Sequence, residues 1–275
     1  MDKLFRHPEI AYPPGSLRQI VSHPVEHSSR AIEVAIFNDH RYAFFYWNSW
    51  LNSLKKKDSN ASVPALVSLD WHQDLCYPDE SEKKSLKKLN LKSKAQTSFF
   101  SWARMVPLND SHILSAAYLN LVSNIYVHCR QGNFAEDWED ESFTDLFGNT
   151  HSIKKFKEFN DLENHLLSSK ETDIFFDIDL DFFALKNGKS DGKFKFTYLP
   201  DETIKNYLSP ERPLIKWIFE RMAGFTIAME PEHTGGFLKS CRYLSLIDHL
   251  YFKPGLFSHR CNWRHVSKAR KQAKT

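Results

Sequence analysis

The chain has 275 residues, with 37 Lys and Arg against 34 Asp and Glu, a net charge of +3 and 14% aromatic residues. This length can bury a sizeable core, and the aromatic content argues against disorder over most of the chain. The balanced charge argues against a dedicated nucleic-acid binder, and no apolar run approaches the roughly 20 residues that a membrane-spanning helix needs. We therefore expect one domain over residues 1–275 whose partners are neither nucleic acid nor membrane.

The ends of the chain and its cysteines give expectations about order and location. Four prolines within residues 1–30 predict an irregular N-terminal segment, and the basic residues 260–275 predict a loosely ordered tail. The N-terminus lacks the apolar segment of a signal peptide. The four cysteines are far apart and match neither a CxxC metal pair nor a small disulfide scaffold, so we expect a cytoplasmic protein. The sequence does not fix the oligomeric state, and a homo-oligomer is compatible with it.

Short apolar segments that predict strands alternate with amphipathic segments that predict helices. The predicted strands are 31–37, 63–69, 124–128, 173–179 and 225–229. The predicted helices are 42–54, 97–105, 111–122, 154–167, 201–208, 211–222 and 238–252. This alternation predicts a single doubly wound α/β fold, in which a parallel sheet carries helices on both faces.

Three polar stretches separate these elements. The Lys-rich residues 79–94 predict a solvated loop or helix face, and residues 186–195 predict a turn. The acidic run 136–141 predicts an exposed loop that favours solubility, with attraction of a cationic substrate as the alternative interpretation.

The most informative stretch follows the predicted strand 63–69. In a nearly extended segment side chains alternate, so Asp70, His72 and Asp74 are expected to point to one side. Two carboxylates and an imidazole, without a thiolate, suit a divalent ion such as Mn²⁺ and less decisively Zn²⁺ or Fe²⁺. Cys76, two residues further on, is expected to be a small buried residue rather than a ligand.

Other predicted strands also end in polar side chains that can bind metal or catalyse. His40 follows the first strand, Asp177 and Asp179 end the fourth, and Glu230 follows the last. In open parallel α/β sheets, sites form beyond the carboxyl ends of the strands. Each signal is weak alone, but four of them at the same topological position favour one shared site.

These residues carry a resemblance to a known family. The segment DWHQD at 70–74 resembles the D-x-H-x-D motif of ureohydrolases, the arginase and agmatinase group, and FDID at 176–179 resembles their second metal motif. His40 is similar to the histidine of their G-G-D-H motif, although both glycines are absent. Glu230 resembles the glutamate that faces the guanidinium. The order of these motifs matches over residues 31–235.

The run DIDLDFF at 177–183 is closer to a divergent branch that includes peptide arginases. These enzymes convert arginine residues of ribosomally made precursor peptides into ornithine. The resemblance implies an arginase/deacetylase-like three-layer fold. It also implies hydrolysis of the guanidino group to ornithine and urea by a metal-bridging hydroxide, with an arginine-containing precursor peptide as the partner.

The resemblance further implies a centre of two Mn²⁺ ions. Two of its ligands would bridge the ions and two more would complete each of them: Asp70 and Asp177 as bridges, His40 and Asp74 on one ion, His72 and Asp179 on the other. Two cations make a bridging water far more acidic than bulk water, which supplies a nucleophile near neutral pH.

The remaining roles concern the substrate and the proton. Glu230 would pair with the planar guanidinium, and Glu232 competes for that role. The leaving amine needs a titratable proton donor, and the candidates are His112, His128 and His233. His233 is favoured slightly because it lies beside Glu230.

Three other functions stay open at this stage. A Zn²⁺-dependent deacetylase or other amidohydrolase of the same fold is the nearest, although the carboxylate-rich set favours two harder ions. A phosphotransferase could use Asp177 and Asp179 but would leave the 70–74 motif unexplained. A non-catalytic binding protein gains weight from the missing glycines near His40.

Overall fold

The structure is a computed structural model of the chain, and it describes residues 11–26, 28–130, 138–188 and 194–266. Within these residues the main sheet has eight strands in the order β1-β2-β10-β7-β3-β4-β6-β5. The six inner strands, β2, β10, β7, β3, β4 and β6, run parallel, and the two edge strands, β1 and β5, are antiparallel to their neighbours. The bounds are β1 Leu17–Ser22, β2 Ala31–Phe37, β3 Ala65–Asp70, β4 Ile125–Cys129, β5 Glu141–Thr144, β6 Thr150–Phe156, β7 Ile174–Asp179 and β10 Met222–Ala228.

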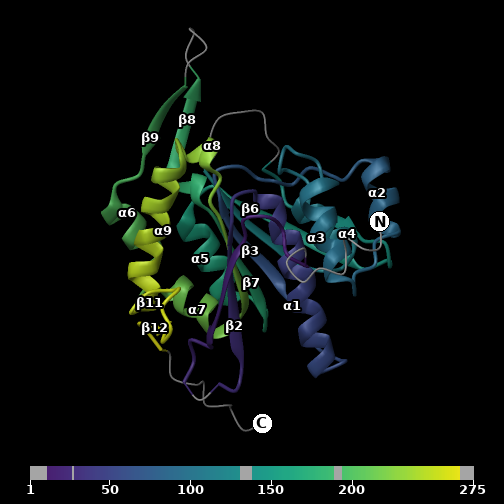
Figure 1. Ribbon diagram of the computed structural model, residues 1–275, viewed down its shortest axis with the longest axis horizontal. Helices are drawn as coiled ribbons and strands as arrows, with labels where there is room; N and C mark the ends of the chain where they lie inside the picture. The colour runs from purple at the N-terminus through teal and green to yellow at the C-terminus, as the bar shows by residue number, and fades with distance from the viewer. Residues whose placement is uncertain (1–10, 27, 131–137, 189–193, 267–275) are drawn as a thin grey trace.

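Helices cover both faces of this sheet (Figure 1). One face carries α1 Ala43–Lys57, α3 Lys94–Ala103 and α4 His112–Tyr118, with α2 Glu80–Lys87 beyond them. The other face carries α5 Phe159–Ser168, α7 Pro213–Arg221 and α9 Phe237–Tyr251, with α6 Asp201–Tyr207 beside α9. The predicted α/β class with helices on both faces is therefore confirmed, as a three-layer arrangement.

Two small hairpins, one short α-helix and two 3-10 helices complete the described elements. The hairpins are β8 Ala184–Gly188 with β9 Phe194–Tyr198 and β11 Phe252–Lys253 with β12 Asn262–Trp263. The helices are α8 Pro231–Thr234 and the 3-10 helices η3 His40–Tyr42 and η4 Leu180–Phe183. No described helix combines the length and the apolar character needed to cross a membrane.

Alternation along the central strands divides the apolar residues between two cores. In β2, Val34 and Ile36 pack toward α5, α7 and α9, whereas Ala35 and Phe37 pack toward α1, α3 and α4. A strand buried on both faces has a nearly continuous apolar sequence. This is why the central strands are recognisable from the sequence, and why the polar residues at their ends stand out.

Several sequence predictions need correction at the sheet edges. The segment 1–30, predicted to be irregular, contains β1, and the predicted tail 260–275 contains β12, in which Trp263 is buried. The predicted helix 154–167 includes residues 154–156, which instead belong to β6. Phe156 lies at helical spacing from residues of α5, yet residues 150–156 alternate in burial as a strand does.

Parts of four predictions fall outside the described residues. These are residues 1–10 and 27 of the N-terminal segment, 136–137 of the acidic run, 189–193 of the predicted turn and 267–275 of the tail. The described ends of that turn region form the β8–β9 hairpin.

Candidate metal centre

Neighbouring strands bring two carboxylates to one level at the edge of the sheet. The register pairs Ser68 with Asp177 and Leu69 with Ile178 between β3 and β7. Asp70 and Asp179, one residue further along, are the last residues of these strands. Asp177 therefore lies two residues inside the sheet, and Asp179 is the residue level with Asp70.

Three carboxylates surround the imidazole of His40, which is fully buried. The Nδ1 atom of His40 lies 3.3 Å from Oδ2 of Asp70 and 3.1 Å from Oδ2 of both Asp74 and Asp179. Asp74 has φ +52°, a left-handed conformation that is uncommon for residues other than glycine. Such strain concentrates at functional sites.

Asp177 holds His40 from the opposite side of the ring. His40 Nε2 lies 2.8 Å from Oδ2 of Asp177, which also accepts a 2.8 Å hydrogen bond from Ser68, and Thr226 donates to Oδ1 at 2.6 Å. With Nε2–H donated to this carboxylate, Nδ1 faces the other three carboxylates. Asp177, predicted to bridge two metals, instead has both oxygens occupied and lies behind the imidazole.

A second group, which we call the His72 group, is formed by His72 and Asp181. The Nδ1 atom of His72 lies 3.1 Å from Oδ2 of Asp181 and 3.9 Å from Oδ1 of Asp70. Asp181 is buried, accepts from the backbone N–H of Trp71 at 3.1 Å, and donates its own N–H to Oδ1 of Asp179 at 3.0 Å. Asp181 is not among the residues predicted from the sequence. The sequence shows acids at every second position, 177, 179 and 181. The strand register is needed to show that Asp177 lies inside the sheet, Asp179 at its edge and Asp181 beyond it.

Glu230 lies beside His40, two residues beyond the end of β10. It has φ +37°, and its Oε1 accepts 2.7 Å hydrogen bonds from the backbone N–H of His40 and from Nδ2 of Asn109. Burial raises the pKa of Glu230 to about 7. Glu232, its predicted competitor, is exposed.

The three candidate proton donors lie in different surroundings. His112 is fully buried, its Nδ1 lies 2.9 Å from the carbonyl of Asn109, and burial lowers its pKa well below the ordinary value. His128 packs against two phenylalanine rings, and burial lowers its pKa to about 4. Only His233 lines the cavity, with its side chain 39% exposed.

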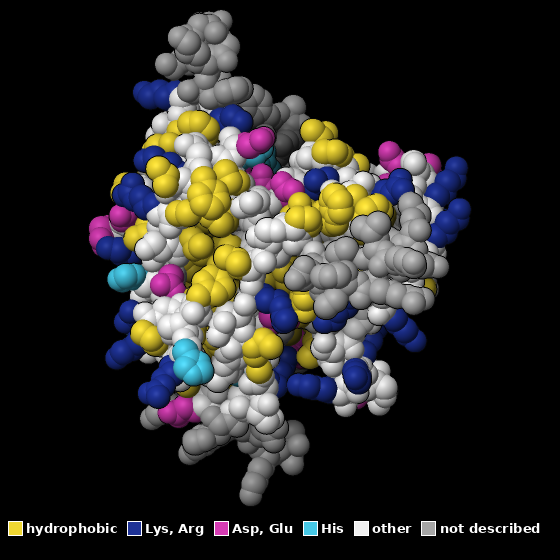
Figure 2. All heavy atoms as spheres, viewed as in Figure 1, with side chains coloured by type: hydrophobic (Ala, Val, Ile, Leu, Met, Phe, Trp, Pro, Cys, Tyr) yellow, Lys and Arg dark blue, Asp and Glu magenta, His cyan; other side chains and the backbone are white. Residues whose placement is uncertain are grey.

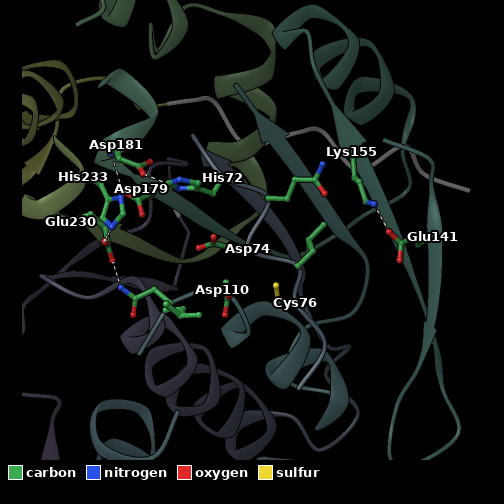
Figure 3. Close-up of a pocket in the computed structure, with 14 residues that line it drawn as sticks. His72, Asp74, Cys76, Asp110, Glu141, Lys155, Asp179, Asp181, Glu230 and His233 are labelled. Atoms are coloured by element: carbon green, nitrogen blue, oxygen red, sulfur yellow. Dashed lines mark hydrogen bonds and ion pairs between the residues drawn. The ribbon is translucent and has the colours of Figure 1, made fainter. Parts of the chain in front are cut away.

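A cavity of about 490 Å³ opens beside these groups (Figure 3). Figure 3 places the His72 group, His233 and Glu230 together on one side and the ion pair of Lys155 with Glu141 on the other. The space-filling view shows acidic side chains and a histidine between apolar areas in its upper part (Figure 2). The lining residues are His72, Gln73, Asp74, Leu75, Cys76, Leu108, Asn109, Asp110, Glu141, Lys155, Asp179, Asp181, Glu230 and His233.

Two predictions about this neighbourhood change. Cys76, expected to be buried, is exposed at the cavity wall because the chain after Asp74 runs along the surface. Glu141, the last residue of the acidic run, begins β5 and is paired with Lys155, which offsets its charge.

The carboxyl groups of the centre are buried close to one another, and this raises the pKa of two of them. Burial, followed by the charges of Asp74 and Asp181, raises the pKa of Asp70 well above its ordinary range. Burial, followed by the charges of Asp181 and Asp70, does the same to the pKa of Asp179. Positive charge placed among these carboxylates would stabilise their ionised forms.

The donor atoms fit divalent ions. Carboxylate oxygens and imidazole nitrogens, without a thiolate, suit Mn²⁺ and similar ions. Adjacent ligand atoms of an octahedral ion with bonds of about 2.1 Å lie about 3.0 Å apart, close to the 3.1–3.3 Å separations around His40. Oδ2 of Asp70 is buried without a hydrogen-bond partner among the described residues, as expected of an oxygen that binds a cation.

Comparison with known proteins does not add a family. No protein-family model matches the chain, and no curated protein matches it.

Proposed function

We propose that the chain is a two-metal hydrolase that cleaves the guanidino group of arginine, carried in a peptide, to give ornithine and urea. The observation that carries this proposal is the convergence of two imidazoles and four carboxylates at the ends of neighbouring parallel strands. The order of the D-x-H-x-D and D-x-D motifs, which resembles that of ureohydrolases, supports the choice of reaction.

The terminal ligands of the two ions follow from the separations of the donor atoms. His40 and Asp74 would belong to the first ion, and His72 and Asp181 to the second. In each pair the imidazole nitrogen and the carboxylate oxygen lie 3.1 Å from each other, a separation that suits two ligands of one ion.

Two carboxylates lie between these pairs. Asp70 would bridge the ions, because its two oxygens face the two histidines separately. Asp179 would be the second shared ligand, since it lies level with Asp70 and contacts His40. Two bound Mn²⁺ ions would supply the acidity that makes a water nucleophilic near neutral pH.

The other cavity residues suit a cationic group. Glu230 is held rigidly by two hydrogen bonds to Oε1, and its Oε2 stays available for a planar guanidinium. Asp110 adds another carboxylate to the same cavity. Lys155 is the only Lys or Arg among the described lining residues, and it is paired with Glu141. The cavity therefore favours a cation over an anion such as a phosphoryl group.

The test is mass spectrometry of an arginine-containing peptide incubated with the chain and Mn²⁺. Conversion to ornithine removes one carbon, two nitrogens and two hydrogens from the peptide and releases urea. We expect Asp70→Asn to abolish conversion and Lys155→Met to retain it as a matched lining-residue control. Conversion that persists in Asp70→Asn protein would show that the reaction does not use this centre.

Parallel substrates separate the alternatives. An acetyl-lysine peptide with Zn²⁺ reports a deacetylase through release of acetate. Absence of every product, with Mn²⁺ still bound, would favour a binding protein with the same centre.

A further inference from the structure

A third imidazole lies beside the His72 group. One ligand atom each from His72, Asp181 and His233 lie within 4.8 Å of one another. The rings of His72 and His233 are edge to face with centroids 5.5 Å apart. Two imidazoles and one carboxylate around an open position form a common ligand set for divalent transition metals.

The backbone around His233 fixes its position. Glu230 has a left-handed conformation immediately before α8, and the N–H of His233 donates to the carbonyl of Glu230 at 2.9 Å. At the other end of α8, Oγ1 of Thr234 and Oγ of Ser240 are 2.6 Å apart, which fastens α8 to α9. The short helix thus presents His233 to the cavity from a constrained turn.

Within the described part of the chain, no hydrogen bond to the ring of His233 competes with metal binding. No hydrogen bond joins its ring to a described residue, and its nearest carboxylate atom is Oε2 of Glu230 at 3.9 Å. His112, which lies near His40 and Asp74, is fully buried and does not line the cavity, and its Nδ1 is 2.9 Å from the carbonyl of Asn109; Nδ1 of His128 is 3.0 Å from the carbonyl of Phe156. An imidazole that lines the cavity without a hydrogen bond retains a nitrogen for a ligand.

We infer that His233 is a further ligand of the second metal ion, together with His72 and Asp181. This inference rests on the two-metal centre of the proposed function. It gives the second position two imidazoles.

At the first position His112 lies near His40 and Asp74, but its Nδ1 is 2.9 Å from the carbonyl of Asn109, so we assign one imidazole, that of His40, to the first ion. Imidazole nitrogen favours Co²⁺ and Zn²⁺ over Mn²⁺ more strongly than carboxylate oxygen does. The second position should therefore prefer Co²⁺ over Mn²⁺ by a larger factor than the first.

The test is a titration of the full metal-free chain with Mn²⁺. Calorimetry measures the binding affinities, and electron paramagnetic resonance distinguishes free from bound Mn²⁺. We expect two bound ions in the native chain. In His233→Ala we expect the second ion to bind at least about 100-fold more weakly, since even residues that only support a ligand contribute about 10–100-fold. The spin-coupled signal of the ion pair should disappear and the signal of one isolated ion should remain.

Two further variants guard against unfolding and unrelated effects. His249→Ala changes an exposed histidine on α9 and should bind two ions like the native chain. His233→Gln keeps the size and polarity of the side chain, and it should weaken the same ion if the imidazole is a ligand. Circular dichroism identifies any variant that has lost the fold.

The outcomes separate this inference from the proposed function. Two ions bound with native affinity by folded His233→Ala protein would overturn the inference, and a fall in turnover alone would then assign proton transfer to His233. If the native chain binds two ions, His233→Ala binds one and no urea forms from arginine peptides, the ligand assignment stands and the proposed function fails.

Discussion

Replacing Asp177 by asparagine distinguishes a residue that supports a ligand from a ligand. Asp177 is fully buried and receives three hydrogen bonds, from Ser68, Thr226 and His40. Asparagine keeps the shape and one acceptor oxygen but removes the charge that orients Nε2–H of His40. The imidazole of His40 is then held less firmly in the orientation that directs Nδ1 toward the three carboxylates.

The magnitude follows from what each substitution removes. Loss of a carboxylate that orients a metal-binding histidine costs about 10–100-fold in metal affinity, or about 1.4–2.7 kcal/mol. We expect Asp177→Asn to weaken the first ion by this factor and to leave the second unchanged. Asp179→Asn removes an oxygen from both ions, so both should weaken by more than about 100-fold.

Calorimetric titration of the metal-free variants with Mn²⁺ measures both affinities. Thr226→Val is a matched control, because it removes one hydrogen bond to Asp177 without touching His40. It should lower the free energy of unfolding by about 1.5–3 kcal/mol, since a bond to a charged group is lost. If Asp177→Asn lost both ions while Asp179→Asn retained one, Asp177 and not Asp179 would be the shared ligand.

Two other predictions concern stability. A Cβ at Gly224 would lie 2.1 Å from Cε3 of Trp50, whose ring is fixed by a hydrogen bond to Glu33. Gly224→Ala should therefore lower the free energy of unfolding, measured in urea, by about 1–3 kcal/mol. An unchanged urea midpoint would contradict this. The pKa of His128 is about 4 in the folded chain and about 6.5 in the unfolded chain. Between these pH values the unfolded chain binds more protons than the folded one, so the folded chain loses stability as the pH falls from about 6.5 to about 4. Between pH 7 and pH 5 the loss should be about 2 kcal/mol in the metal-free chain, and His128→Leu should lack it. An equal pH dependence in both proteins would show that His128 is not responsible.

The fold is most predictable from the sequence where strands are buried on both faces. The apolar runs that form β2, β3 and β7 have the length and composition of strands that are buried on both faces of a sheet. The edge elements are harder to predict. In β1 and β6 polar and charged residues interrupt the apolar ones without a strict two-residue period. The pairing that makes these segments strands comes from neighbours distant in sequence.

The candidate site was predicted in its location but not in all its members. His40, Asp70, His72 and Asp74 gather as expected from their positions at strand ends. The choice between Asp177 and Asp181 depends on how far β7 extends relative to β3, and register is a property of the pairing that one strand alone does not reveal.

We propose above all that two metal ions bind between these strand ends. Anomalous X-ray diffraction at the manganese absorption edge, from crystals grown with Mn²⁺, tests it most directly. We expect two peaks with Asp70 and Asp179 between them, one beside Nδ1 of His40 and the other beside Nδ1 of His72. A single peak, no peak, or a peak in contact with Asp177 would contradict the proposed centre.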